Sequence, residues 1–246
     1  MGEIVTAAMV VIGDEILSGR TKDQNIGHLA DILTAVGIDL KEVRIVADDE
    51  GAIVEAVNIL RARNTYVFTT GGIGPTHDDI TADAIARAFD LPCDYEEKAF
   101  RMLEEHYAKR GIEFSEARKR MARMPEGAKH IPNPISIAPG FNVENVYVMA
   151  GVPAIFQAML DALLPTLKVG TKLISVAVPS PLPEGTMGGA LGQIQQAHPD
   201  TIIGSYPKYE EGRFWTEVVV RSRSEEALKA AKEAVEAMID SLMKRK

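Results

Sequence analysis

The segment TTGGIGPTHDDIT at residues 69–81 places three glycines, a proline, a histidine and two adjacent aspartates in one short stretch. Glycine tolerates positive φ and lacks a Cβ atom, so backbone amides in such a turn can close around an oxyanion. The spacing matches neither GxxxxGK[ST] nor GxGxxG, and a tight strand-to-helix turn without a ligand would look the same. The residues predicted to bind a phosphate here are Gly71, Gly72, Gly74, Pro75 and Thr76.

Carboxylates accompany this turn in unusual density. One member of the pair Asp78 and Asp79 is expected to cap the following helix, which leaves the other facing the turn. Carboxylates alone would repel a phosphate, so an acidic phosphate site implies a bound cation such as Mg²⁺, which takes one or two carboxylates plus phosphate oxygens. The predicted metal ligands are Asp79, Asp48, Glu15 and Asp14, and Asp79 and Asp48 are also the predicted catalytic residues.

The elements that must position these residues follow from periodicity. Residues 4–13, 38–46 and 65–70 are predicted strands, and the segments around 26–36 and 48–63 have apolar residues at helical spacing. A β-α-β-α-β order with short connections predicts an α/β fold with a parallel sheet and helices on both faces. Ligands bind beyond the carboxyl ends of such strands, so the loops at 13–15, 48–49, 71–79 and 150–152 are expected to converge.

The rest of the chain divides near residues 168–172. Helices are predicted at 79–89, 94–111, 115–124 and 152–167, a strand at 145–151, and an irregular segment at 125–141. Residues after 170 follow a β-α-β-β-α order with a hairpin turn at 209–212. The predicted domains are therefore 1–169 and a small α+β domain at 170–246.

Composition excludes several functional classes. The 246 residues carry a formal charge of −8, which argues against a nonspecific nucleic-acid binder. The single Cys93 excludes an intrachain disulfide and a CxxC metal site. There is no apolar run of about 18 residues, and the first residues lack the basic segment of a signal peptide. We expect a cytoplasmic protein with no nucleic-acid or membrane partner.

Several motifs together resemble a known family. GDEILSGRTKDQN, VADDE, TTGGIGPTHDDIT, PEGA, APGF and GVP resemble the MoaB/Mog-type molybdopterin-binding domain over about residues 4–167. Within that superfamily they are most similar to the amino-terminal domain of competence/damage-inducible protein A (CinA). The segment IGSYPKYEEGRFWTEVVV is similar to the tail of CinA-like proteins and to the related domain of eukaryotic FAD synthases.

The resemblance implies a three-layer α/β/α sandwich, a homo-oligomer and a nucleotide or pterin ligand. Adenylyltransferase relatives join a pterin phosphate to AMP with Mg²⁺, whereas CinA-like and FAD-synthase relatives are linked to hydrolysis of ADP-ribose or FAD. By position, Glu15, Asp48 and Asp79 match the family's acids, and the three glycines at 71–74 match its phosphate loop. The chain departs from the usual pattern at Ser136, Ala150 and residues 118–121. Further predicted ligand-binding residues are Gly13, Ser136, Pro139 and Gly140.

Three classes of function follow. The leading one is a metal-dependent enzyme that hydrolyses a nucleotide pyrophosphate such as ADP-ribose or FAD, with Mg²⁺, Mn²⁺ or Co²⁺, with a molybdopterin adenylyltransferase of molybdenum cofactor biosynthesis as the alternative reaction. The second is a non-catalytic pterin- or nucleotide-binding module. The third is a protein-interaction scaffold built on the charged helices at 94–124.

Overall fold

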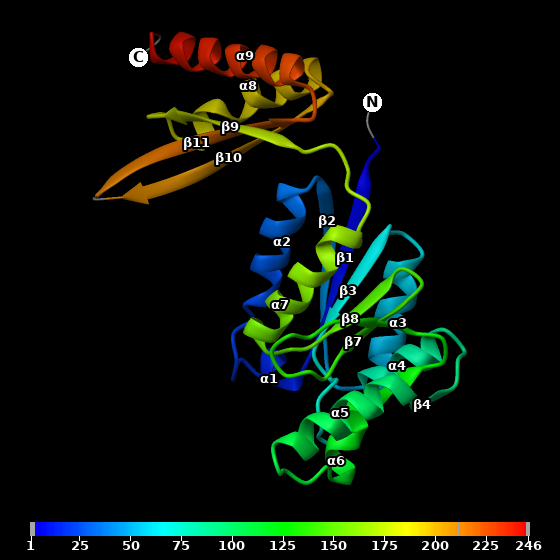
Figure 1. Cartoon of the computed structure of the whole chain (residues 1–246). Coiled ribbons are helices and arrows are strands. Elements are labelled where there is room, and N and C mark those ends of the chain that lie inside the picture. Colours follow the sequence, from blue (N-terminus) through cyan, green and yellow to red (C-terminus); the bar gives the residue numbers. More distant parts are fainter. Residues whose placement is uncertain (1–2, 211, 245–246) are drawn as a thin grey trace. The chain divides into compact units, whose positions relative to one another are not determined.

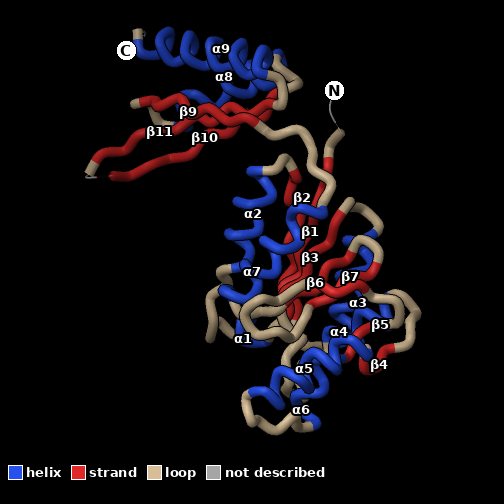
Figure 2. Tube along the Cα trace, in the orientation of Figure 1, coloured by secondary structure: helices blue, strands red, loops and turns tan. Residues whose placement is uncertain are grey.

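The structure is a computed structural model that describes residues 3–210 and 212–244. The chain divides into two compact units, residues 1–170 and 171–246. Glu211, part of the predicted hairpin turn, lies outside the described residues. Each unit has its own sheet and its own core (Figures 1 and 2).

The first unit is built on a six-stranded sheet with the order β2-β1-β3-β8-β7-β6. The first four strands in this order are parallel, whereas β7 and β6 are antiparallel to their neighbours. The strands are β1 Val5–Ile12, β2 Ile38–Val46, β3 Tyr66–Thr70, β6 Lys129–Ile131, β7 Gly140–Val143 and β8 Val146–Met149. The predicted, mostly parallel sheet is confirmed.

Helices cover both faces of this sheet (Figure 1). Along β1, Val10 belongs to a core shared with α3 Glu50–Arg61 and α4 Thr81–Ala88. The adjacent Met9 belongs to a core shared with α2 Asn25–Ala35 and α7 Pro153–Leu163. A strand that is buried on both faces must be apolar throughout, which explains the unbroken apolar run at residues 7–12. The three-layer α/β/α arrangement is confirmed.

The region between α4 and β7 differs from the prediction. α5 Glu97–Lys109 is followed by the short α6 Glu116–Lys119 and a 3-10 turn at Arg120–Ala122. The predicted helix over 115–124 is wrong at its end, because β5 Arg123–Pro125 pairs there with β4 Cys93–Tyr95. The segment predicted to be irregular contains β6 and the start of β7. Strands this short carry too little alternation to be recognised from sequence.

Short helical segments complete the first unit. α1 Asp14–Leu17 directly follows β1, and a 3-10 turn at Leu164–Thr166 follows α7. Cys93 is half-buried in β4, and this burial raises the pKa of its thiol to about 12. Such a thiol is not ionised at neutral pH, which fits a structural role.

The second unit has a three-stranded antiparallel sheet with the order β10-β11-β9. Its strands are β9 Ile174–Ser180, β10 Thr201–Glu210 and β11 Arg213–Ser222, and its helices are α8 Glu184–Ala197 and α9 Glu225–Met243. Alternate β11 residues such as Val218 and Val220 pack in one core with Met187 of α8 and Val235 of α9. In the described part of the chain, no helix combines the length and the apolar character that crossing a membrane requires.

Candidate functional site

A cavity of about 510 Å³ lies at the carboxyl ends of the parallel strands. It collects residues from the loops after β1, β2, β3 and β8, as the strand order predicts. Its wall includes most of the site residues predicted from sequence: Gly13, Glu15, Asp48, Gly71, Gly72, Gly74, Pro75, Asp79 and Ser136. The loop acids and the glycine turn therefore face one space.

The glycine turn has a shape that only glycine permits at two positions. Gly71 has φ +106, and a Cβ atom there would lie 2.1 Å from the carbonyl oxygen of Ile12. Gly72 has φ +67, and its Cβ would lie 2.1 Å from Oγ1 of Thr81. The turn is held from behind, because Thr81 donates its amide to the Gly72 carbonyl at 3.0 Å and its hydroxyl to the Gly71 carbonyl at 3.0 Å.

The backbone amides of the turn divide into used and unused donors. The amide of Gly71 donates to the Met149 carbonyl at 3.2 Å, and the amide of Thr76 donates to Asp79 Oδ2 at 2.7 Å. Within residues 3–210 and 212–244, the amides at positions 72, 73 and 74 donate to no protein acceptor. These three consecutive donors line the cavity and are the ones available to an oxyanion.

Asp79 has a structural function within the turn. Its Oδ2 accepts from both the amide and the hydroxyl of Thr76, at 2.7 and 2.6 Å. A Cβ on Gly74 would lie 2.7 Å from the same oxygen, so the turn wraps closely around the carboxylate. The expectation that an aspartate caps α4 is wrong. That helix begins at Thr81, and the residue before it, Ile80, makes no side-chain capping bond.

The remaining acids cluster around Asp48. Its Oδ2 accepts the amide of Asp14 at 3.0 Å. Burial, together with the nearby charges of Asp14, Glu15 and Asp78, raises the pKa of this carboxyl above its ordinary value. A raised pKa means that the ionised form of Asp48 is disfavoured, so a bound cation would stabilise the ionised carboxylate by reducing the repulsion from its neighbours.

The side chains predicted to bind a metal ion do not form a complete ligand set. Among the residues that the structure describes, no group of three His, Cys, Asp or Glu side chains is placed to hold a metal ion. Glu15, Asp48 and Asp79 line the cavity, whereas Asp14 is not among its lining residues. This arrangement fits a magnesium-like ion only when ligand phosphates supply further oxygens.

The cavity also has an apolar wall. Its residues are Ile12, Met121, Ala138, Ala150, Val152, Pro153 and Ile155. Ala150 and Val152 belong to a loop that was expected at the site, whereas the others were not predicted from the sequence. The buried Asn133, which also lines the cavity, holds a short loop together. Its Nδ2 donates to Ser136 Oγ at 2.7 Å, and its Oδ1 accepts the backbone amide of Ser136 at 3.1 Å. Ile137 in that loop has φ +68, a costly conformation for a β-branched residue.

A buried asparagine joins two of the loops that form the site. Asn25, 3% exposed, donates from Nδ2 to Thr70 Oγ1 and to the Gly151 carbonyl, both at 2.9 Å. Thr70 in turn donates to the Ala150 carbonyl at 2.9 Å. The motif GRTKDQN contributes to the family resemblance, but nothing in its spacing indicates that the Asn25 side chain bonds both Thr70 of β3 and the loop after β8.

Other predicted ligand-binding residues are engaged within the protein. Thr76 and Gly140 are not among the residues that line the cavity, and the Thr76 hydroxyl donates to Asp79. Gly13 lines the cavity, but its amide donates to the Val46 carbonyl at 3.1 Å. Gly140 is buried in β7, where a Cβ would lie 2.3 Å from the Val148 carbonyl oxygen. Strand packing is thus sufficient to explain that glycine.

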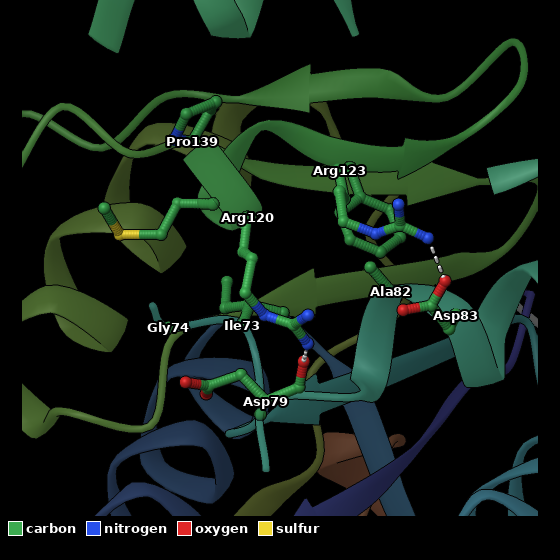
Figure 3. Close-up of a pocket in the computed structure, with 11 residues that line it drawn as sticks. Ile73, Gly74, Asp79, Ala82, Asp83, Arg120, Arg123 and Pro139 are labelled. Atoms are coloured by element: carbon green, nitrogen blue, oxygen red, sulfur yellow. Dashed lines mark hydrogen bonds and ion pairs between the residues drawn. The ribbon is translucent and has the colours of Figure 1, made fainter. Parts of the chain in front are cut away.

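A small hollow of about 10 Å³ lies beside the cavity and shares several lining residues with it: Gly72, Ile73, Gly74, Asp79 and Met121. Pro139, Arg120 and Arg123 line the hollow only (Figure 3). Arg120 donates to the Asp79 carbonyl at 3.1 Å, and Arg123 forms an ion pair with Asp83.

Comparison with known proteins agrees with this architecture. Residues 8–169 match the family model described as probable molybdopterin binding domain. The chain belongs to this family. Residues 172–245 match the model described as the middle domain of FAD synthase. The resemblance stated from the motifs is confirmed for both parts of the chain.

Similar proteins occur in several archaea. A protein of Pyrobaculum arsenaticum is 32% identical over 97% of this chain and 95% of its own length. A protein of Caldivirga maquilingensis is 40% identical over 66% of this chain, and the match spans 65% of that protein. The crystal structure of CinA from Thermoplasma acidophilum, a protein of unknown function, has a TM-score of 0.61 and 30% identity, covering 66% of this chain and 98% of that one.

Proposed function

We propose that the first unit binds a nucleotide pyrophosphate, of the ADP-ribose or FAD kind, and hydrolyses it with the help of a divalent cation. The observation that carries this proposal is the meeting, in one cavity, of unpartnered turn amides, crowded carboxylates and an apolar wall. Each of the three suits one part of such a ligand: the phosphates, the cation and the ring.

The phosphates would bind at the glycine turn. The amides at positions 72–74 would donate to phosphoryl oxygens, in the way that consecutive backbone amides bind anions elsewhere. Asp79 would keep the turn in the binding shape through its two bonds from Thr76. The apolar wall, with Met121, Val152 and Ile155, would cover a flavin, base or pterin ring.

Hydrolysis would break the P–O–P bond by attack of water, giving AMP together with FMN from FAD or ribose phosphate from ADP-ribose. Asp48 suits the role of general base, because its carboxylate lines the same cavity as the glycine turn. When bound, Mg²⁺ or a similar cation would neutralise charge on the phosphoryl oxygens. Glu15 and Asp79 are the residues that would hold it, which leaves Asp48 free to accept the proton of the attacking water.

A second candidate is a non-catalytic module that binds a pterin or nucleotide phosphate. The incomplete ligand set favours it, because no three acidic or histidine side chains of the described residues are placed together around a metal position. The same turn and apolar wall would then bind a ligand without turnover. An adenylyltransferase would use the same phosphate turn with a pterin phosphate as the attacking group in place of water.

One experiment separates these candidates. The full chain is incubated with FAD, ADP-ribose or ATP, with and without Mg²⁺, Mn²⁺ or Co²⁺, and AMP is measured by chromatography. We expect AMP from FAD or ADP-ribose, with release reduced about 100-fold in Asp48→Asn and also strongly reduced in Asp79→Asn. Binding of these ligands by calorimetry without release of AMP would reject the hydrolase and support the binding module.

A further inference from the structure

The main cavity lacks cationic side chains. Its lining, as the described residues define it, includes the carboxylates of Glu15, Asp48, Asp78 and Asp79 but no lysine or arginine. A diphosphate would therefore meet net negative charge, offset only by turn amides and a bound cation. A positive group close behind the turn would change that balance.

Arg120 is such a group. Its guanidinium reaches the back of the glycine turn, where it donates to the Asp79 carbonyl and lies beside Ile73 and Gly74 (Figure 3). Within the described part of the chain it has no carboxylate partner at ion-pair distance. Its Nε is buried and makes no hydrogen bond, which is also true of Arg123, so the two arginines differ in their ion pairing and not in this respect. This guanidinium thus keeps an uncompensated charge and spare donors next to the predicted phosphate position.

Arg123 provides the contrast. It lines the same hollow, but its charge is compensated by the ion pair with Asp83. The hydrogen bond to Asp83 also raises the pKa of Arg123. The two arginines are close in sequence, but Arg120 bonds the Asp79 carbonyl whereas Arg123 pairs with the Asp83 carboxylate. Arg123 therefore serves as the control for Arg120.

We propose that Arg120 is an anion-recognition residue, which supplies positive charge from behind the glycine turn to a diphosphate bound at the amides of residues 72–74. Through the Asp79 carbonyl it also positions the carboxylate that holds Thr76, and hence the shape of the turn. This inference rests on the proposed phosphate position but not on hydrolysis, since binding alone requires the charge.

The test is calorimetric titration of the full chain with inorganic pyrophosphate in the presence of Mg²⁺. We expect Arg120→Met to weaken binding about tenfold or more, because a positive charge close to the bound diphosphate would be lost. Arg120→Lys should lose less, because it keeps the charge while losing the planar donor geometry. Arg123→Met should bind pyrophosphate within about twofold of the unaltered chain, since its charge is already matched.

The outcomes are decisive in each direction. Unchanged affinity in Arg120→Met, or equal loss in Arg123→Met, would overturn the proposal, as would an unaltered chain that does not bind pyrophosphate. A lysine variant as weak as the methionine variant would also overturn it, because the effect would then come from packing. Pyrophosphate binding without AMP release from FAD or ADP-ribose would reject the hydrolase alone and leave this test intact.

Discussion

The main sheets of the two units connect their strands differently, and in the described part of the chain the cavity lined by polar loops lies at the edge of the mostly parallel sheet. In the first unit, β1, β2, β3 and β8 are parallel, so their carboxyl ends and the loops that follow them meet at one edge. In the second unit, β11 is antiparallel to both β10 and β9, so the loop after β11 lies at the opposite end of the sheet from the loops after β9 and β10. Topology, rather than composition, decides where polar residues can accumulate.

The charges in the two units reflect this difference. In the second unit, Lys208 faces Glu217 across adjacent strands at 3.8 Å, and Lys232 pairs with Glu236 along α9 at 2.9 Å. The first unit also contains ion pairs, such as Arg123 with Asp83, but its Asp48 lies near other carboxylates, and burial together with these charges raises the pKa of Asp48. Paired charges are typical of a solvated surface. Like charges held close together instead indicate a binding site for a cation, either alone or together with an anionic ligand.

The largest expected effect tests whether the turn after β3, at the edge of the first sheet, requires glycine for its stability. Gly71→Ala should lower the free energy of unfolding of the first unit by about 3 kcal/mol, because its Cβ meets the Ile12 carbonyl and its φ is positive. Urea unfolding followed by circular dichroism measures this. Fluorescence of Trp215, the single tryptophan of the chain, reports the second unit and should be unaffected.

The matched control is Gly127→Ala, a position with φ +76 but with no atom near the added Cβ. We expect a cost of about 1 kcal/mol there, from backbone strain alone. Equal losses at the two glycines would show that the contact with Ile12 is unimportant.

The next effect concerns the crowded carboxylates. Asp48→Asn should reduce AMP release from ADP-ribose about 100-fold, as loss of a general base does. The neighbouring Asp49 caps α3 by accepting the Ala52 amide at 2.8 Å, and Asp49→Asn keeps this cap while removing the same charge. Asp49→Asn should therefore retain activity within about twofold, and equal loss would argue against a specific role for Asp48.

The pH dependence of Asp48 has a definite sign. In the folded chain without a bound cation, burial and the neighbouring carboxylates raise the pKa of Asp48 above its ordinary value. The same shift means that ionised Asp48 lowers stability as pH rises through this pKa, so Asp48→Asn should be more stable than the unaltered chain at neutral pH. Thermal unfolding at neutral and acidic pH tests this.

A smaller effect compares helix caps in the two units. Glu96 caps α5 through the Ala99 amide at 2.8 Å, and Ser224 caps α9 through the Ala227 amide at 3.2 Å. Either residue changed to alanine should cost about 1 kcal/mol of unfolding free energy at neutral pH.

Only one of these caps titrates. Burial opposes ionisation of Glu96, but hydrogen bonds from the amides of Ala99 and Lys98 and from His130 hold its pKa below the ordinary value of 4.5. Its contribution is present above that value and lost as pH falls through the lowered pKa. Urea unfolding should therefore show the Glu96→Ala loss shrinking in acid and the Ser224→Ala loss persisting. A pH-independent Glu96→Ala loss would contradict this.

The smallest effect is a gain in the second unit. Gly188 lies inside α8 with no atom within 4 Å of an added Cβ. Gly188→Ala should raise the unfolding free energy of the second unit by about 0.5 to 1 kcal/mol, because alanine loses less conformational entropy in a helix. The urea midpoint from Trp215 fluorescence measures it, and a decrease would indicate a packing role for this glycine.

Much of the fold could be predicted because long elements carry a strong period. The strand at 38–46 is observed at Ile38–Val46, and the helix at 48–63 is observed at Glu50–Arg61. The short strands β4 and β5 could not be predicted, since three residues give no usable alternation and each is stabilised by the other. The same limit applies to β6, which pairs with β7 across a loop.

The candidate site divides in the same way between local and distant effects. Gly72, Asp48 and Glu15 were predicted because they follow strands whose order brings their loops to one edge. Asn133 and Met121 were not, because they reach the cavity from the segment between α5 and β7, whose path has no local signature.

By itself the sequence determined which segments form the parallel strands, and therefore which loops share an edge, because periodicity and crossover handedness are local properties. Only the tertiary structure decided which amides stay unpaired, that the Asp79 carboxylate is engaged by Thr76, and that Arg120 lies behind the turn without a counter-ion. These features depend on distances between atoms that are far apart in the chain. Whether a donor or a charge finds a partner is therefore decided only by the folded structure.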